Sequence, residues 1–143
     1  MSKYDEAITI LVERFARDRD ISIATLEDGR PYVRMVDAYY ENGAFYTVTS
    51  ALSNKIKHIE ENSEVAVCGE WFSGHGIGEN LGHVLDEKNA PIMATLREAF
   101  AHWYIAHVDE SDPNRCLLRV KLTDGILIHE GATFAIDFIN QTA

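Results

Sequence analysis

The sequence predicts a mainly antiparallel α+β fold, in which the strands form a β-barrel and helices are inserted between them. Apolar and polar residues alternate in several short runs, as expected for strands with one buried face. Two turn signals, Glu27-Asp28-Gly29-Arg30 and Asn42-Gly43, separate the first of these runs at hairpin spacing. No strand–helix–strand alternation is sustained along the chain. These observations favour an antiparallel barrel over a doubly wound parallel sheet.

The first third of the chain predicts one helix followed by a three-stranded meander. Ser2 can cap the helix, and apolar residues then recur at helical spacing up to about Asp18: Ile8, Leu11, Val12 and Phe15. From Ile21 the period changes to two, which is typical of strands. The two turn signals divide the following residues into strands over 21–25, 32–40 and 45–49.

The rest of the chain predicts two helices and several further strands. Ser53 is a candidate N-cap for a short helix that ends near Asn62, and Pro91 suits the first position of a longer helix over 91–108. A glycine-rich loop is expected between them, over 74–82. The remaining apolar runs predict strands over 65–71 and 81–85, a closing hairpin of 116–122 and 126–130 around Thr123-Asp124-Gly125, and an added strand over 132–138.

Composition limits the classes of partner. A chain of 143 residues is expected to form a single domain over residues 1–143, and 46% hydrophobic with 25% charged residues argues against disorder. The net charge of −10 disfavours nucleic acids and anionic membranes, and a small anionic ligand would need a local cluster of donors. Because no apolar run reaches membrane length, we expect a soluble, cytoplasmic protein with no membrane partner.

Several familiar chemistries lack support in this sequence. The run Gly74-His75-Gly76-Ile77-Gly78 does not follow a first strand and open a helix, as a dinucleotide fingerprint must. The six histidines show no metal-ligand spacing, so no metal site is expected, although haem ligation by one of them stays an alternative. Cys68 and Cys116 are interpreted as ordinary packed thiols.

The segment Thr47-Val48-Thr49-Ser50-Ala51-Leu52-Ser53-Asn54-Lys55 carries the strongest functional signal. A strand ends in two hydroxyl residues, a short turn follows, and a helix begins with Lys55 in its first turn. Hydroxyl groups, an ammonium and the N–H groups of the helix N-terminus would then converge, and these are the components of a phosphate site. The alternative is that Ser53 only caps its helix and Lys55 is a solvated surface residue.

At these residues the chain resembles the pyridoxamine 5′-phosphate oxidase-like, FMN-binding split-barrel family. The stretches that carry the resemblance are "ATLEDGRPYVRMVDAYYENGAFYTVTS", "SNKIKHIEEN" and "EVAVCGEW". The resemblance implies a six-stranded split β-barrel with inserted and flanking helices. It also implies FMN as the cofactor, bound at the interface of a homodimer.

The resemblance further implies which residues hold FMN. Its phosphate would be bound by Arg34 and by a set of residues after the third strand: Thr49, Ser50, Ser53, Asn54 and Lys55. Asn54 stands where the family has a second basic residue, which weakens this cradle. The backbone around Met35 and Val36 would lie along the isoalloxazine edge. Trp71 and Trp103 are candidates to pack on the ring, with plain core or interface packing as the alternative for each.

The function expected from the resemblance is an FMN-dependent oxidoreductase that passes electrons from NAD(P)H to an unidentified small acceptor. A flavin or haem carrier or sensor without turnover is the alternative. Oxidation of pyridoxamine phosphate itself is not expected, because the family's true oxidase has a longer C-terminal part with residues for that substrate, whereas this sequence stops soon after Phe138. No catalytic residue is assigned.

Overall fold

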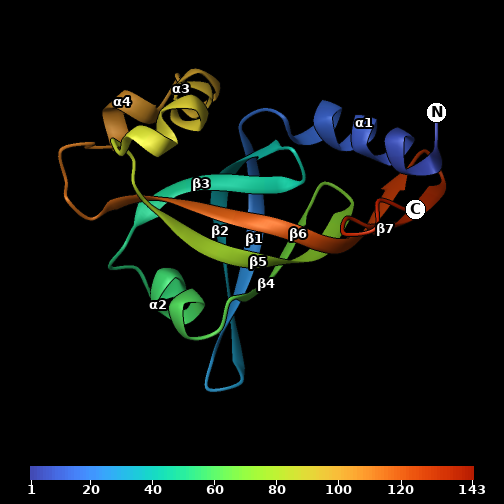
Figure 1. Ribbon diagram of the computed structural model, residues 1–143, viewed down its shortest axis with the longest axis horizontal. Helices are drawn as coiled ribbons and strands as arrows, with labels where there is room; N and C mark the ends of the chain where they lie inside the picture. Colours follow the sequence, from blue (N-terminus) through green and yellow to red (C-terminus); the bar gives the residue numbers. More distant parts are fainter.

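The computed structural model describes all 143 residues as a barrel of long strands with helices packed at its ends (Figure 1). In chain order, the elements are α1 (Lys3–Phe15), β1 (Arg19–Glu27), β2 (Arg30–Glu41), β3 (Ala44–Ser50), α2 (Asn54–Glu61), β4 (Glu64–Gly69), β5 (Phe72–His83), the 3-10 helix η1 (Glu87–Asn89), α3 (Ala90–Ala99), α4 (Tyr104–His107), β6 (Arg115–His129) and β7 (Ala132–Asp137). None of the helices combines the length and the apolar character needed to cross a bilayer.

All strand pairings are antiparallel, and six strands close into a barrel. The order in the sheet is β3-β2-β1-β4-β5-β6-β7, and an additional β3–β6 pairing closes the ring. Strand β6 makes this closure possible because its 15 residues pair with β3, β5 and β7 in turn. The predicted six-stranded barrel with inserted and flanking helices is therefore confirmed, and β7 extends the sheet beyond it.

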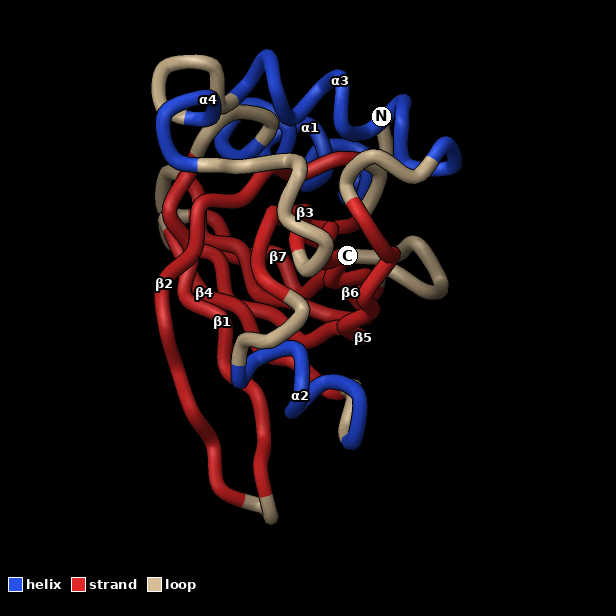
Figure 2. Tube along the Cα trace, turned by 90° about the vertical axis from the view of Figure 1, so that its left-hand side faces the viewer, coloured by secondary structure: helices blue, strands red, loops and turns tan.

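The two predicted hairpin turns and the predicted helix cap are confirmed. Asn42 and Gly43 have φ angles of 49° and 79°, which match the turn type that suits the right-handed strand twist. The β1–β2 hairpin turns in the same way and projects past the barrel on the side of α2 (Figure 2). At the start of α1, the Asp5 N–H donates to Ser2 Oγ at 3.0 Å and the Ser2 N–H donates to Asp5 Oδ2 at 3.3 Å.

The barrel is filled by apolar side chains, and a second, smaller core lies under the helices after β5. Within the barrel, the rings of Phe15, Phe45 and Phe72 pack with centroids 5.3–6.3 Å apart. The second core comprises six buried residues: Val84, Met93, Leu96, Phe100, Tyr104 and Leu117. The lower end of the barrel in Figure 1, between the β1–β2 hairpin and α2, carries neither helix α3 nor α4.

Two predictions for the glycine-rich part of the chain are wrong. The predicted loop over 74–82 lies within β5, where Gly74, Gly76 and Gly78 are buried on the inner face; a Cβ at Gly74 would approach the Asp124 carbonyl oxygen to 2.7 Å. The predicted turn Thr123-Asp124-Gly125 lies within β6, where the register shifts beside Thr123 as in a β-bulge. At Gly125 a Cβ would lie 2.6 Å from the Phe72 ring, so this glycine permits close packing, not a turn.

The single helix predicted over 91–108 is also wrong, because the chain leaves the helical ladder at Phe100. Leu96, Phe100 and Tyr104 keep a four-residue spacing and are all buried, which explains the misleading periodicity. The indole Nε1–H of Trp103 donates to Asp18 Oδ2 at 2.8 Å, and this tertiary contact holds the turn between α3 and α4 against the α1–β1 connection.

Candidate functional site

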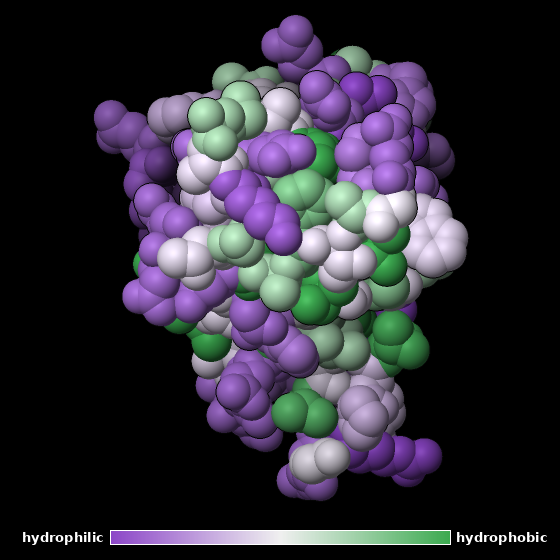
Figure 3. Space-filling view, turned by 90° about the vertical axis from the view of Figure 1, so that its right-hand side faces the viewer, coloured by the Kyte–Doolittle hydropathy of each residue, from purple (hydrophilic) through white to green (hydrophobic).

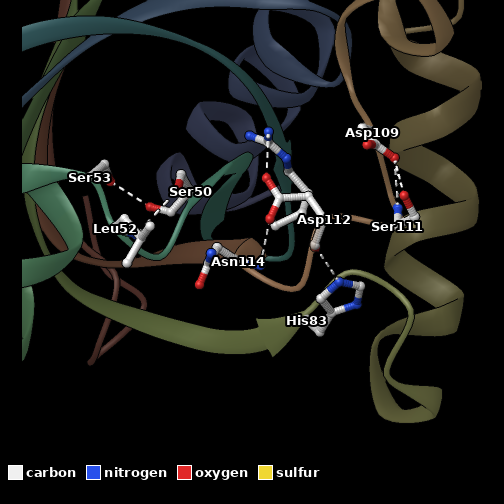
Figure 4. A network of polar contacts seen from close by, with 9 residues as sticks. Ser50, Leu52, Ser53, His83, Asp109, Ser111, Asp112 and Asn114 are labelled. Atoms are coloured by element: carbon white, nitrogen blue, oxygen red, sulfur yellow. Dashed lines mark hydrogen bonds and ion pairs between the residues drawn. The ribbon is translucent and has the colours of Figure 1, made fainter.

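The hydroxyl-rich turn between β3 and α2 is closed by hydrogen bonds to its own backbone (Figure 4). The Ser53 hydroxyl donates to the Ser50 carbonyl oxygen at 2.7 Å, and the Leu52 N–H donates to Ser50 Oγ at 3.2 Å. The Ala51 N–H donates to the Asn114 carbonyl oxygen at 2.7 Å, which joins the turn to the segment before β6. The turn is therefore held in one shape from both sides.

Helix α2 begins without a side-chain cap. Ser53 occupies the N-cap position with extended backbone, but its hydroxyl donates backwards to Ser50 and caps no N–H of the helix. The first hydrogen bond of the helix runs from the Lys57 N–H to the Ser53 carbonyl oxygen at 3.2 Å. The N–H groups at the start of α2 thus keep their capacity to bind an anion. Of the two alternatives for Ser53, simple capping is excluded.

Two cations stand beside this helix start. Arg34, on β2, and Lys55, in the first turn of α2, are both partly buried. Burial lowers the pKa of the Lys55 ammonium and the positive charge of Arg34 lowers that pKa further, whereas the Cys116 thiol acts in the opposite direction. Burial also lowers the pKa of Arg34. Lys57, by contrast, is exposed.

No carboxylate lies within ion-pair distance of these two charges. None of the ion pairs in the structure includes Arg34 or Lys55. Adjacent, partly desolvated cations repel each other, and an anion between them relieves both the repulsion and the lost hydration.

The Arg34 guanidinium is tethered at one nitrogen only. Nη1 donates to Thr25 Oγ1 at 2.8 Å and to the Ile23 carbonyl oxygen at 3.2 Å. Nε and Nη2 have no partner within the chain. Two donors of a planar fork are therefore left for an external acceptor, and such a fork matches two oxygens of a carboxylate or a phosphate.

A buried polar chain behind Arg34 was not predicted. Thr25 Oγ1 lies 2.8 Å from His58 Nδ1, and His58 Nε2 lies 3.1 Å from Glu27 Oε2. The alternation of side chains between the two faces of the β1–β2 hairpin is the sequence feature from which this polar chain could have been predicted. Ile23 pairs with Arg34, and Thr25 lies two residues further along β1 on the same face. His58 follows Lys55 by three residues on α2, which places them on neighbouring sides of one helical turn.

The other predicted site residues fall into two groups. Thr49 is buried near the end of β3, where it pairs with Cys116, whereas Asn54 is exposed at the start of α2. Both belong to the same segment as Lys55. Met35 is 66% exposed on the outer face of β2, and Val36, next to it, packs against the barrel core.

The two tryptophans have other contacts within the chain. Trp71 lies in the turn between β4 and β5, where its carbonyl oxygen accepts from the Ile128 N–H; its side chain is 77% exposed. Trp103 packs against Phe100 with ring centroids 5.0 Å apart and donates to Asp18. The structure does not bring either indole to Arg34 or Lys55 within one chain.

The outer sheet face of β1, β4 and β5 is hollow and partly apolar. Small residues from β1, β4 and β5 form its floor: Ser22, Ala24, Ala66, Cys68 and Ser73. Val33 and Ile126, at the edges, are 71% and 44% exposed. This cavity of about 300 Å³ adjoins a second one of about 530 Å³ with which it shares Ala24, Ala66, His75 and Asp124.

A separate cavity of about 720 Å³ lies between α1 and the C-terminal segment. Figure 3 shows this side of the molecule, where hydrophobic atoms lie in patches between hydrophilic margins. Its lining combines Tyr4 and Ile8 of α1 with Phe138 and Ile139 after β7. Lys121 is the one basic residue of this lining, which also contains Asp5, so the cavity offers no cluster of cations like that around Arg34.

Comparison with known proteins relates the chain to one family. The sequence model described as pyridoxamine 5′-phosphate oxidase matches residues 11–129. General stress protein 26 of Bacillus subtilis (strain 168) is 24% identical to the chain over 115 residues, which cover 77% of this chain and 79% of that protein. The matched region contains Arg34, the turn after β3 and all of α2.

Solved structures share the fold. A haem-binding protein from Mycobacterium smegmatis superposes with a TM-score of 0.72 at 15% identity, covering 99% of this chain and 60% of that one. A FAD-binding protein from Mesorhizobium loti superposes with a TM-score of 0.62 at 19% identity, covering 87% of this chain and 92% of that one. At these identities the likeness establishes a common architecture.

Proposed function

The chain belongs to the pyridoxamine 5′-phosphate oxidase family, and from that premise we propose that it binds FMN and acts as an oxidoreductase between NAD(P)H and a small acceptor. The observation that carries the proposal is the pair of partly buried cations, Arg34 and Lys55, that no carboxylate neutralises. A phosphate monoester is the anion whose charge and oxygens match two cations, a helix start and a hydroxyl-rich turn.

In this proposal, each residue of the cluster has a distinct role. Arg34 donates from Nε and Nη2 to two phosphate oxygens, and the Lys55 ammonium neutralises further charge from the other side. The N–H groups at the start of α2 and the hydroxyls of Ser50 and Ser53 supply neutral donors, which need no proton transfer. When bound, FMN supplies the redox chemistry that carries electrons from NADH or NADPH to the acceptor.

The isoalloxazine ring would extend from this phosphate along β2, past Met35 and Val36. The outer face there is exposed and apolar at Val33 and Met35, which are 71% and 66% exposed. A ring of this size lying on such a face needs a second wall to exclude water. The proposal therefore includes a homodimer in which a second copy covers this face, and in which Trp71 or Trp103 of either copy is free to contact the ring.

A flavin or haem carrier without turnover is the second candidate, because structures with this fold include a FAD-binding and a haem-binding protein. Two histidines are poorly suited to ligate haem iron. Both ring nitrogens of His58 have partners, and those of His83 are held by the Leu85 N–H and the Asp112 carbonyl oxygen. These contacts favour flavin over haem at the barrel end near α2.

The test is to titrate FMN and riboflavin separately into the apo-protein, followed by flavin fluorescence, and then to add NADH or NADPH under air. We expect FMN to bind at one per chain and more tightly than riboflavin, and bound flavin to turn over NADH or NADPH. Equal affinity for the two flavins, or binding of neither, overturns the phosphate assignment. A Soret band with haem and no flavin binding selects the haem carrier, and tight FMN binding without turnover selects the flavin carrier.

A further inference from the structure

Four side chains form a continuous hydrogen-bonded chain that ends at the Arg34 guanidinium. Glu27 lies 3.1 Å from His58 Nε2, His58 Nδ1 lies 2.8 Å from Thr25 Oγ1, and Arg34 Nη1 donates to the same oxygen at 2.8 Å. The two middle members are almost wholly buried, since Thr25 is 1% and His58 4% exposed. Glu27 reaches solvent, with 52% of its side chain exposed.

One set of hydrogen-bond directions gives every member of this series a partner. An arginine only donates, so Thr25 Oγ1 accepts from Arg34. The single hydroxyl proton of Thr25 is then available for His58 Nδ1, which is the other polar atom in reach. With Nδ1 accepting, the ring proton of His58 is on Nε2 and donates to the Glu27 carboxylate.

This series of hydrogen bonds constrains one edge of the Arg34 guanidinium and leaves the other edge free. Thr25 and the Ile23 carbonyl oxygen both hold Nη1, whereas Nε and Nη2 have no protein partner. An arginine side chain loses much rotamer freedom when it binds a ligand, and holding it beforehand removes that cost from the binding step. His58 in turn fixes the Thr25 hydroxyl, which otherwise rotates among several acceptors.

We infer that His58 is a positioning residue for the anion site: through Thr25 it fixes the Arg34 guanidinium with Nε and Nη2 directed at the phosphate. This inference rests on the proposed function. Helix α2 then serves the site twice, through Lys55 at its start and through His58 one turn later. The β1–β2 hairpin supplies the remaining members, which explains why this hairpin lies beside α2 (Figure 2).

A buried histidine can also serve only to attach a helix to a hairpin, and the two roles differ in what they predict. If His58 only attaches the helix, removing its side chain weakens the binding of FMN and of riboflavin by the same factor. If His58 positions Arg34, removing it weakens the binding of FMN alone, because only FMN has a phosphate. The quantity that separates them is the ratio of the riboflavin Kd to the FMN Kd, measured for each variant by fluorescence titration.

The decisive variants are His58→Leu, His58→Asn and Thr25→Val. His58→Leu removes both ring contacts, and we expect the Kd ratio to fall about two- to tenfold, as for the loss of one hydrogen bond. His58→Asn keeps a polar atom near the position of Nδ1 and should retain most of the ratio. On the Thr25→Val background, His58→Leu should lower the Kd ratio no further, because the hydroxyl that links His58 to Arg34 is already missing.

A matched control destabilises the protein elsewhere. Leu96→Ala removes a fully buried side chain from the second core, which has no contact with this chain of hydrogen bonds. It should lower thermal stability at least as much as His58→Leu and leave the Kd ratio unchanged. If His58→Leu raises both dissociation constants by the same factor, or if it lowers the ratio equally with and without the Thr25 hydroxyl, the positioning role is wrong.

A ligand-free readout tests the inference apart from the proposed function. The ¹⁵N relaxation of the Arg34 Nε–H should report an ordered group in the apo-protein and a mobile one in His58→Leu, with Leu96→Ala like the wild type. Equal order in all three overturns the inference. An ordered Arg34 that becomes mobile in His58→Leu, together with equal FMN and riboflavin affinity in the wild type, would uphold positioning and reject the phosphate as the ligand.

Discussion

Arg34 lies close enough to Lys55 for its positive charge to lower the pKa of the Lys55 ammonium, although the two residues belong to β2 and α2. A protein gains no stability from placing two partly desolvated cations side by side. Their proximity is explained if both serve one anion. This relationship distinguishes the two lysines of α2, because Lys55 is half-buried and the charge of Arg34 lowers its pKa, whereas Lys57 is exposed.

Lys55→Ala should weaken FMN binding about ten- to a hundredfold. A hydrogen bond to a charged group contributes roughly 1.5–3 kcal/mol, which corresponds to that change in Kd. Riboflavin, which has no phosphate, should be affected much less. Lys57→Ala is the matched control in the same helix, and it should change neither affinity by more than a few tenths of a kcal/mol. Titration of both flavins into both apo-variants gives the answer, and identical behaviour of the two variants would place the phosphate elsewhere.

A second prediction concerns Asp37, whose contribution to the free energy of unfolding depends on pH. Burial, together with Asp18 and Asp20 beside it, raises the pKa of the Asp37 carboxyl from its ordinary 3.8 to about 7. Between these values the folded protein holds a proton that the unfolded chain has lost. The free energy of unfolding therefore falls as the pH rises from about 4 to about 7, and stays lower above that.

Asp37→Asn should remove this penalty. We expect the variant to melt at a higher temperature than the wild type at pH 8 and at nearly the same temperature at pH 4. Solvent screening keeps the gain small, because the carboxyl is only partly buried. Glu98→Gln, at an exposed position whose side chain makes no hydrogen bond, is the control for the loss of one negative charge and should show no such pH dependence. Thermal unfolding at both pH values measures the difference, and an equal shift at pH 4 and pH 8 would contradict the assignment.

A third prediction follows from the glycines of β5. At Gly76 a Cβ would lie 2.7 Å from the Lys121 carbonyl oxygen and 2.8 Å from Val120, so Gly76→Ala must displace backbone. We expect a loss of about 2–3 kcal/mol in the free energy of unfolding, at the upper end for overpacking. Gly69→Ala is the comparison, since its nearest neighbour is an Ile21 methyl at 3.3 Å, and it should cost less than about 1 kcal/mol. Urea unfolding of both variants tests this order, and equal stability of the two would contradict it.

The same glycines show where sequence patterns predicted the fold and where they did not. Asn42-Gly43 requires positive φ, a local property, so its hairpin was predicted correctly. Gly74 and Gly76 are required by the backbone of β6 and Gly125 by the Phe72 ring, contacts between residues more than 40 positions apart, so they were misread as loop and turn. Likewise the helix break before Trp103 depends on Asp18, 85 residues away, which no local periodicity contains.

The candidate site, too, contains residues that the sequence predicted and residues that only the tertiary structure reveals. The turn after β3 and the position of Lys55 follow from local order along the chain, and the resemblance added Arg34. In the structure the charge of Arg34 acts on the Lys55 ammonium, and their role toward a phosphate stays a prediction. His58 and Thr25 were missed because each looks ordinary alone: one is a polar residue on a helix and the other a threonine in a strand. Their role depends on three elements meeting at the barrel end.

The last prediction is a homodimer that covers the outer face of β1 and β2. Val33 and Met35 are exposed there, next to a floor of small side chains that a second copy could approach closely. Light scattering at micromolar protein should give twice the chain mass of 16.1 kDa. Val33→Glu should reduce the mass to that of one chain, because two copies would each bury a charge at the contact. FMN binding should weaken with it, since the ring loses its second wall.

Ile105→Glu is the control for that experiment. Ile105 is 88% exposed on α4 and lies outside the cavities of the outer face, so a charge there should leave the dimer and its FMN affinity intact. A wild-type monomer that still binds FMN tightly would show that one chain suffices to enclose the ring. A dimer that persists in Val33→Glu but separates in Ile105→Glu would show instead that the copies meet through the helices above the barrel, and the outer face of β2 would then remain open to substrate.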